Sequence, residues 1–413
     1  MFAVVRRVVI AAIALFLIWS MVGSIRQALP PKTVFIETGP VGGSYHENAL
    51  RYASKLDAAG LRTEVLPNPQ SLETINKLND LREKVDIGFT VQPLDDSRYP
   101  NVASVGVIEL QPLFVFYNLG LGKLQTPMSL RGKRLVMPPE KSATAEAARS
   151  VLGLYGLNEK NTTFTYLPIS QAVEELKTGK HDAGFFMLAP ANKIIHDLVS
   201  ADTLSLLSIP EAVGVSRILD HLKPATVPLG AFDLQNNLPD SDTTVISGMV
   251  NVMVKKDINP AVLYVLLDAM KDAHHGQTLV SAKGDFPSMV GTELEVHPLA
   301  AQWAKSGTPW IFVRFGPVVA SLIDKYWLLA LVLVLLAEVY RTSRYLYELT
   351  ELSASSTALR ILLHLQKRLA DGRMPGRFGK QLFRIAEAIT ARESQNAKAR
   401  ALLEQLRPVM TKH

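Results

Sequence analysis

A glycine-rich loop between a predicted strand and a predicted helix carries groups suited to holding an anion. It covers residues 38–46 and includes Gly39, Gly43, Ser44, Tyr45 and His46. Glycines let backbone N–H groups approach a ligand closely, and the N-terminus of a helix attracts negative charge. The loop lacks the G-x-G-x-x-G spacing of a dinucleotide site and the lysine of a P-loop. It predicts binding of a small anion, with an ordinary tight turn as the alternative.

Other predicted strands are followed by residues that suit the same cleft. Gln92 follows one strand, Ser142 and Thr144 precede a helix after another, and Phe186 ends a third. Ligands bind at the carboxyl ends of strands in parallel α/β sheets, so these residues are candidates for ligand contact. The alternatives are that Ser142 and Thr144 are plain helix caps and that Phe186 belongs to the core.

An enzyme is the main alternative from a different class, because His46 and Glu47 lie near Ser44. The chain has neither a G-x-S-x-G elbow nor an H-E-x-x-H motif. His274 and His275 are adjacent, so their rings point apart on a helix, and we expect them to be solvated or capping. The absence of cysteine excludes disulfides, cysteine-ligated zinc and a cysteine nucleophile. We therefore expect a binding protein without a metal or cofactor.

Strands and helices alternate twice along the middle of the chain. The first set places strands at 33–38, 61–66, 85–90 and 105–118, with helices at 45–59 and 71–82. The second places strands at 135–137, 164–167 and 182–186, with helices at 142–155, 170–176 and 190–199. Ser71 and Ser170 are candidate helix caps. Both sets contain Asp-x-Gly-Phe, at 86–89 and at 182–185. This alternation predicts βαβ units and a parallel sheet.

A further strand at 246–255 and a helix at 260–273 complete the pattern of a two-lobed α/β clamp. We expect the chain to cross between lobes near 112–118 and 246–255. Lobe 1 then comprises 30–118 and 246–315, and lobe 2 comprises 119–245.

Two hydrophobic stretches, 8–23 and 326–340, flank this domain. Basic residues precede the first, and 341–413 holds fourteen Lys and Arg against six Asp and Glu. The positive-inside rule then places both termini in the cytoplasm and the middle outside it. The anchors are expected at 1–29 and 316–340, the second with Tyr326 and Trp327 at the outer interface. A cleaved signal peptide at the first stretch and a buried hairpin at the second are the alternatives.

The basic pI of about 9.2 comes from the tail at 341–413, which predicts contact with anionic lipid and not with nucleic acid. Apolar stripes predict two helices there, at 345–370 and 378–407, folded as a hairpin. This tail could transmit closure of the clamp, contact a permease or only brace the anchor.

The chain resembles the TAXI-type solute receptors of tripartite ATP-independent periplasmic (TRAP) transporters, and in particular their membrane-anchored branch. The resemblance covers about 33–300 and rests on the order and spacing of several segments. These are TGPVGGSY at 38–45, DIGFTVQ at 86–92, SLRGKR at 129–134, SAT at 142–144, QAVEELKTGKHDAGFF at 171–186 and VMVKKD at 252–257. HPLA at 297–300 and GTPW at 307–310 match the end of the anchored branch.

The resemblance implies a periplasmic-binding-protein type II fold in a bacterial inner membrane. It implies capture of a small organic anion, such as a carboxylate or an amino acid, and a TRAP permease as partner. Binding roles pass to the matching residues, which are Gly39, Gly43, Ser44, Tyr45, Gln92, Ser142, Thr144 and Phe186. The chain departs from the family pattern at His46, where a second aromatic is usual, and at Ala143, where glycine is usual. A ligand sensor or scaffold that signals to the tail is the alternative function.

Overall fold

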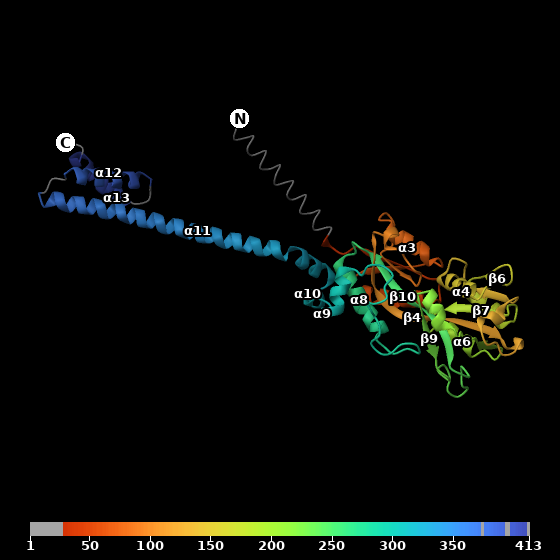
Figure 1. Ribbon diagram of the computed structural model, residues 1–413. Coiled ribbons are helices and arrows are strands. Elements are labelled where there is room, and N and C mark those ends of the chain that lie inside the picture. The colour runs from red at the N-terminus through yellow and green to blue at the C-terminus, as the bar shows by residue number, and fades with distance from the viewer. Residues whose placement is uncertain (1–27, 373–375, 393–396, 411–413) are drawn as a thin grey trace. The chain divides into compact units, whose positions relative to one another are not determined.

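The computed structural model describes residues 28–372, 376–392 and 397–410, without the side chains of 344–356 and 392 (Figure 1). The predicted first hydrophobic stretch lies outside the described residues. The chain divides into two compact units, one ending at Lys325 and the other beginning at Tyr326.

Two parallel three-stranded arrangements form the first unit, as the repeated alternation predicted. In each of them the first strand along the chain lies between the other two. The first set consists of β1 (Thr33–Thr38), α2 (Ser44–Ala58), β2 (Arg62–Pro67), α3 (Ser71–Asn79) and β3 (Ile87–Thr90). The second consists of β5 (Arg134–Met137), α4 (Ala143–Leu154), β6 (Thr163–Tyr166), α5 (Ile169–Lys177) and β7 (Ala183–Met187). Gln70 and Pro168 cap α3 and α5, so the predicted caps Ser71 and Ser170 are wrong by one and two residues.

Two long antiparallel strands join these arrangements into one mixed sheet. They are β4 (Val102–Asn118) and β10 (Thr243–Lys255), and the sheet has the order β2-β1-β3-β10-β4-β7-β5-β6. The first part of β4 pairs with β10, and its last part pairs with β7. The chain thus passes from one half to the other within β4 and β10, where the sequence predicted crossings. Since the halves share one sheet, the lobe boundaries at 118 and 245 stay a prediction.

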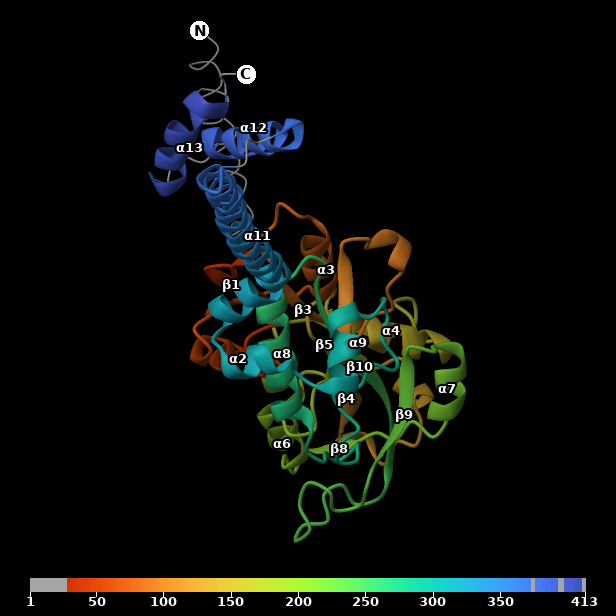
Figure 2. The same cartoon turned by 90° about the vertical axis from the view of Figure 1, so that its left-hand side faces the viewer.

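The remaining elements extend this sheet or lie outside it, and they were only partly predicted. They are β8 (Leu204–Leu206), β9 (Leu222–Val227), α6 (Lys193–Val199), α7 (Ala212–Ile218), α8 (Pro260–His274), α9 (Pro298–Ser306), α10 (Trp310–Arg314) and the 3₁₀ turns η1 (Asp96–Arg98), η2 (Leu119–Leu121) and η3 (Pro127–Leu130). Helix α8 packs beside α2, as Figure 2 shows. The shortest strand and the shortest α-helix among these elements, β8 and α10, have three and five residues, too few for a periodic signal.

The repeated Asp-x-Gly-Phe motif has the same structural role in both halves. Asp86 Oδ2 accepts a hydrogen bond from the N–H of Phe35 in β1, at 2.9 Å. Asp182 Oδ2 accepts one from the N–H of Arg134 in β5, at 2.8 Å. Each aspartate therefore ties the start of the central parallel strand to the next strand along the sheet. The two phenylalanines, Phe89 and Phe185, are each 1 % exposed and belong to the hydrophobic core.

A long apolar helix leaves the first unit. Helix α11 runs from Pro317 to Ala370, and its first part, Pro317–Ser343, contains an 18-residue stretch with a mean hydropathy of 2.1. Only 11 % of the most apolar part is buried, unlike the core helix of a soluble protein. By length and composition this segment can cross a membrane, since 27 residues rise about 40 Å against a hydrocarbon core of about 30 Å.

The second unit ends in α12 (Arg377–Arg392) and α13 (Ala397–Met410), which pack on the end of α11. Leu362, Leu365, Phe383 and Leu406 are among the buried residues that join them. The predicted pair of helices is therefore wrong in two respects. The first helix continues α11 without a break, and the predicted helix at 378–407 is described as two helices.

Candidate ligand-binding site

The N-termini of α2 and α4 meet at one cavity of about 50 Å³ between the two halves of the sheet. Lobe 1 contributes Gly39, Pro40, Gly43, Ser44, Tyr45, Pro69, Ser71 and Gln111. Lobe 2 contributes Pro138, Ser142, Ala143, Thr144, Ile169, Met187 and Leu188. None of these lining residues, all in the described part of the chain, is charged. The cavity is thus bordered by backbone dipoles, hydroxyls and apolar side chains.

The glycine loop shapes the start of α2. Gly42 adopts φ +82°, which favours glycine, and the N–H of Gly43 donates to the carbonyl oxygen of Pro40 at 3.0 Å. A Cβ atom on Gly43 would stand 3.1 Å from that oxygen, so the turn leaves little room for a side chain. The first N–H groups of a helix have no partner within it. Those of Ser44 and Tyr45 therefore remain for a ligand in the cavity they line.

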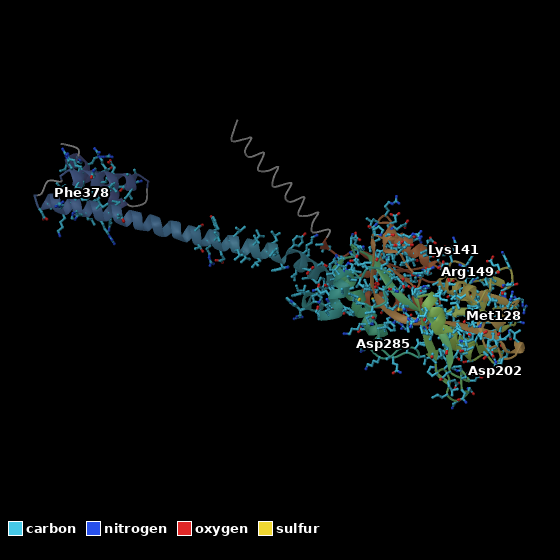
Figure 3. All side chains as sticks on the ribbon, viewed as in Figure 1. Met128, Lys141, Arg149, Asp202, Asp285 and Phe378 are labelled. Carbon is cyan, nitrogen blue, oxygen red and sulfur yellow. The ribbon has the colours of Figure 1, made fainter. Side chains whose placement is uncertain are left out.

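Helix α4 presents a matching end from lobe 2. Ser142 is its N-cap, and its Oγ accepts from the N–H of Ala145 at 3.2 Å. The N–H groups of Ala143 and Thr144 are the first of this helix and lack intrahelical acceptors. Lys141, labelled with Arg149 in Figure 3, precedes the cap and is exposed. The two helix dipoles and this lysine make the cavity attractive to an anion.

Tyr45 adds a hydroxyl donor that has no partner. Its ring stacks on Phe89, with centroids 5.5 Å apart, and its hydroxyl is buried without a hydrogen bond among the described residues. Burial, together with the nearby Glu109 carboxyl, raises the pKa of Tyr45 far above its usual value. The hydroxyl therefore stays protonated and is a donor without an acceptor among the described residues. An orphaned buried hydroxyl costs stability, which makes a ligand acceptor favourable here.

Direct contacts already bridge the two lobes. Ser44 Oγ accepts from the N–H of Ala189 at 2.8 Å, and Asn192 Nδ2 donates to the carbonyl oxygen of Gly42 at 3.1 Å. Gln92 Nε2 also meets the carboxylate of Glu146 on α4. The structure is therefore a closed clamp, which accounts for the small volume of the cavity.

Six of the nine predicted residues line this cavity: Gly39, Gly43, Ser44, Tyr45, Ser142 and Thr144. Their ligand contact stays a prediction, but the structure brings them together from segments about a hundred residues apart. Ser142 also caps α4, so its predicted role as a helix cap is compatible with its position in the lining of the cavity.

Three predicted residues lie outside the lining of this cavity, and their contact with a ligand stays a prediction. Phe186 is fully buried in the lobe 2 core beside Phe116. Gln92 is held by Ser71 and Glu146 outside the lining of the cavity. His46 points back to Thr38, with Nδ1 and Oγ1 3.3 Å apart.

Gln111 and Met187 are lining residues that the sequence analysis missed. Gln111 is 2 % exposed and donates from Nε2 to Glu109 Oε1 at 2.7 Å. A signal existed, because Glu109 and Gln111 are polar residues inside an otherwise apolar strand. Met187 follows Phe186 and has no polar feature that marks it.

The geometry does not assemble a catalytic group around Ser44. Its Oγ meets the N–H of Ala189, and His46 meets Thr38, so no nucleophile and base are paired here. Within the described residues no cluster of histidine and carboxylate side chains could hold a metal. The expectation that His274 is solvated or capping is wrong. Its ring is buried, with Nε2 2.7 Å from the Tyr52 hydroxyl.

Comparison with known proteins gives one family and several distant structures. A sequence model described as the NMT1-like family matches residues 36–294, more than half of the chain. The BenM effector-binding domain with benzoate is 14 % identical with a TM-score of 0.38, over 59 % of this chain and 92 % of that one. An arginine-bound amino-acid ABC transporter substrate-binding protein, AbpA from Streptococcus pneumoniae, is 15 % identical with a TM-score of 0.36, over 58 % and 88 %. Likenesses this distant leave the ligand of the chain open.

Proposed function

The chain belongs to the NMT1-like family, and on that premise we propose that it is a solute-binding protein that captures a small organic anion. One observation carries the proposal. A helix N-terminus from each lobe lies at the same uncharged cavity, and the N–H groups of Ser44, Tyr45, Ala143 and Thr144 have no acceptor within their own helices. A carboxylate placed there accepts hydrogen bonds from both lobes at once.

Ligand binding then favours closure. The carboxylate contacts α2 and α4 together only when the lobes meet, so bound ligand shifts the population toward the closed clamp. Ile169, Met187 and Leu188 supply an apolar wall for the carbon skeleton. The cavity of about 50 Å³ limits the ligand of this closed form to a few heavy atoms. A glutamate-sized ligand requires the lobes to stand further apart.

The Tyr45→Phe variant tests the site with effects of opposite sign. Without ligand, its loss of an orphaned buried hydroxyl should leave the unfolding temperature unchanged or raised. With ligand, loss of a hydrogen bond to a charged group should weaken binding by about tenfold or more. Calorimetric titration of the full chain in detergent micelles with acetate, propionate, malonate and succinate measures the affinity, and scanning calorimetry without ligand measures the unfolding temperature.

Tyr155→Phe is the matched control, because its hydroxyl donates to Glu211 at 2.9 Å, away from the cavity. This variant should bind the anions with unchanged affinity. The proposal fails if none of the four anions binds the unaltered chain, or if Tyr45→Phe binds them as tightly as the unaltered chain does.

We further propose that the domain is a membrane-anchored TAXI-type receptor for a TRAP permease, with both termini in the cytoplasm. The segments at 38–45 and 142–144 that carry the resemblance both border the cavity. Exposed Trp310 and Phe315 precede the apolar helix, as aromatic residues do at a membrane interface. A sensor role is the second candidate, favoured by the continuity of α11 from Pro317 to Ala370.

A green fluorescent protein fused after residue 413 tests the anchor, since it fluoresces only when the tail stays in the cytoplasm. We expect fluorescence from the unaltered chain and its loss in a Leu331→Arg, Leu335→Arg variant. Each arginine at the centre of a membrane span costs about 2.5–3.5 kcal/mol of insertion free energy. Leu234→Arg, at a position that is 82 % exposed in the first unit, should leave the signal unchanged. If the fusion of the unaltered chain did not fluoresce, the proposed cytoplasmic location of the C-terminus would be contradicted.

A further inference from the structure

A second and larger cavity, of about 560 Å³, borders the same lobes. It shares only Ser44 with the first cavity among their lining residues. Its wall comes from α2, from β4, from the segment at 189–196 in lobe 2 and from the segment that follows α8. This volume is typical of sites for small organic ligands, whereas the first cavity is ten times smaller.

The Glu109 carboxyl is the buried acidic group of this wall. Its Oε1 accepts from Asn48 Nδ2 at 3.0 Å and from Gln111 Nε2 at 2.7 Å. Its Oε2 lies 3.9 Å from His274 Nδ1, too far for a hydrogen bond. No other partner of Oε2 occurs among the described residues. One carboxylate oxygen is therefore left to accept from a ligand in the cavity it borders.

Charged groups of both signs stand on α2 at the same cavity. Arg51 is exposed and forms no ion pair within the described part of the chain. Glu47 is one helical turn before it and adds a second carboxylate. His274 is no competing cation, because burial and the charge of Arg51 lower its pKa to about 4. The wall thus offers two carboxylates, one guanidinium and the imidazole rings of His196 and His274, with Glu109 Oε2 and the Arg51 guanidinium both unsatisfied among the described residues.

We propose that this second cavity binds a small zwitterion, an α-amino acid, separately from the anion in the first cavity. Its ammonium group donates to Glu109 Oε2, and its carboxylate pairs with the Arg51 guanidinium. Ile108, Leu279 and Phe286 line the cavity and contact the aliphatic side chain. A simple amine leaves Arg51 unpaired, and a simple anion leaves Glu109 unpaired, so the zwitterion is the ligand that satisfies both.

Calorimetric titration of the full chain in detergent micelles at pH 8 tests the proposal with L-alanine, L-leucine and L-glutamine. At this pH the Glu109 carboxyl is ionised, since burial raises its pKa only to about 7. Two analogues of leucine each lack one of its charged groups: 3-methylbutylamine lacks the carboxylate, and 4-methylpentanoate lacks the ammonium group. Both should bind at least tenfold more weakly than leucine. Glu109→Gln and Arg51→Gln should each weaken amino-acid binding at least tenfold. The first keeps the shape of the side chain and the second changes an exposed residue, so both should fold.

Thr144→Val distinguishes the two cavities, because it changes the wall of the first alone. Amino-acid affinity should be unchanged in this variant. The proposal is overturned if none of the three amino acids binds, or if Glu109→Gln and Arg51→Gln bind them normally. It is also overturned if Thr144→Val weakens amino-acid binding as much as those two do, since the amino acid then occupies the first cavity.

Discussion

The Glu109→Gln variant is expected to gain about 3 kcal/mol in free energy of unfolding, relative to the unaltered chain, between pH 4.5 and pH 8. Burial raises the pKa of Glu109 from 4.5 to about 7, against the smaller effects of hydrogen bonds from Gln111 and Asn48. Between pH 4.5 and about pH 7, Glu109 has lost its proton in the unfolded chain but still holds it in the folded chain. Stability of the unaltered chain therefore falls as pH rises through this window. About 1.4 kcal/mol per pH unit gives the expected magnitude.

The comparison must be between variants, because His274 acts in the opposite direction. Its pKa is lowered from 6.5 to about 4, so it adds stability as pH rises between those values. The changes of unfolding free energy with pH that these two groups cause largely cancel in the unaltered chain. The Glu109→Gln substitution removes only the change caused by Glu109. The charged and titratable neighbours of Glu109 are Tyr45, Glu47, Arg51 and Tyr52 on α2 and His274 on α8.

Urea unfolding of both chains at pH 4.5, 6, 7 and 8, followed by tryptophan fluorescence, measures this difference. Glu159→Gln, at an exposed position in a loop, is the matched control and should show no such gain. A difference between Glu109→Gln and the unaltered chain that stays constant across the four pH values would show that the carboxyl is not held protonated by burial.

The second large effect is expected from valine at Gly88, which should lower the free energy of unfolding by about 3 kcal/mol, at the upper end of the cost of overpacking. A Cβ atom there would stand 2.7 Å from Thr74 Cγ2 and 2.9 Å from Leu78 Cδ1. Threonine is branched at Cβ and stiff, so it cannot turn its methyl group away freely. The collision pushes α3 off the strand that it covers.

The same substitution at Gly184 should have a similar effect, because the motif repeats in lobe 2. A Cβ atom there would stand 2.8 Å from Leu176 Cδ2 on α5 and 3.0 Å from Phe186 Cε2. Gly120→Val is the control, since a Cβ atom at Gly120 meets nothing within 4 Å. Urea unfolding measures all three. Equal stabilities for the Gly120 and Gly88 variants would show that the glycine is not required for packing of α3.

The sequence by itself determined the alternation of elements, the repeated motif and six of the fifteen residues that line the first cavity. Helix and strand periods and the cap at Ser142 depend on residues within about four positions, so they can be read locally. The glycine loop and the cap both precede helices that follow parallel strands. Such helix N-termini meet at the carboxyl edge of the strands, which is why Ser44 and Thr144 could be paired in advance.

The tertiary structure alone decided which neighbouring residues line the first cavity. Phe185 and Phe186 point to opposite faces of β7, and both are core because helices cover both faces of this strand. The side chain of Gln92 hydrogen-bonds to Ser71 of α3 and Glu146 of α4, and the sequence does not show that these residues lie beside it. Glu109 of β4 and Arg51 of α2 line one cavity, and Asn48 of α2 joins the two elements there by its hydrogen bond to Glu109. Contacts of this kind depend on which face of each element is covered, and that is set by residues far away along the chain.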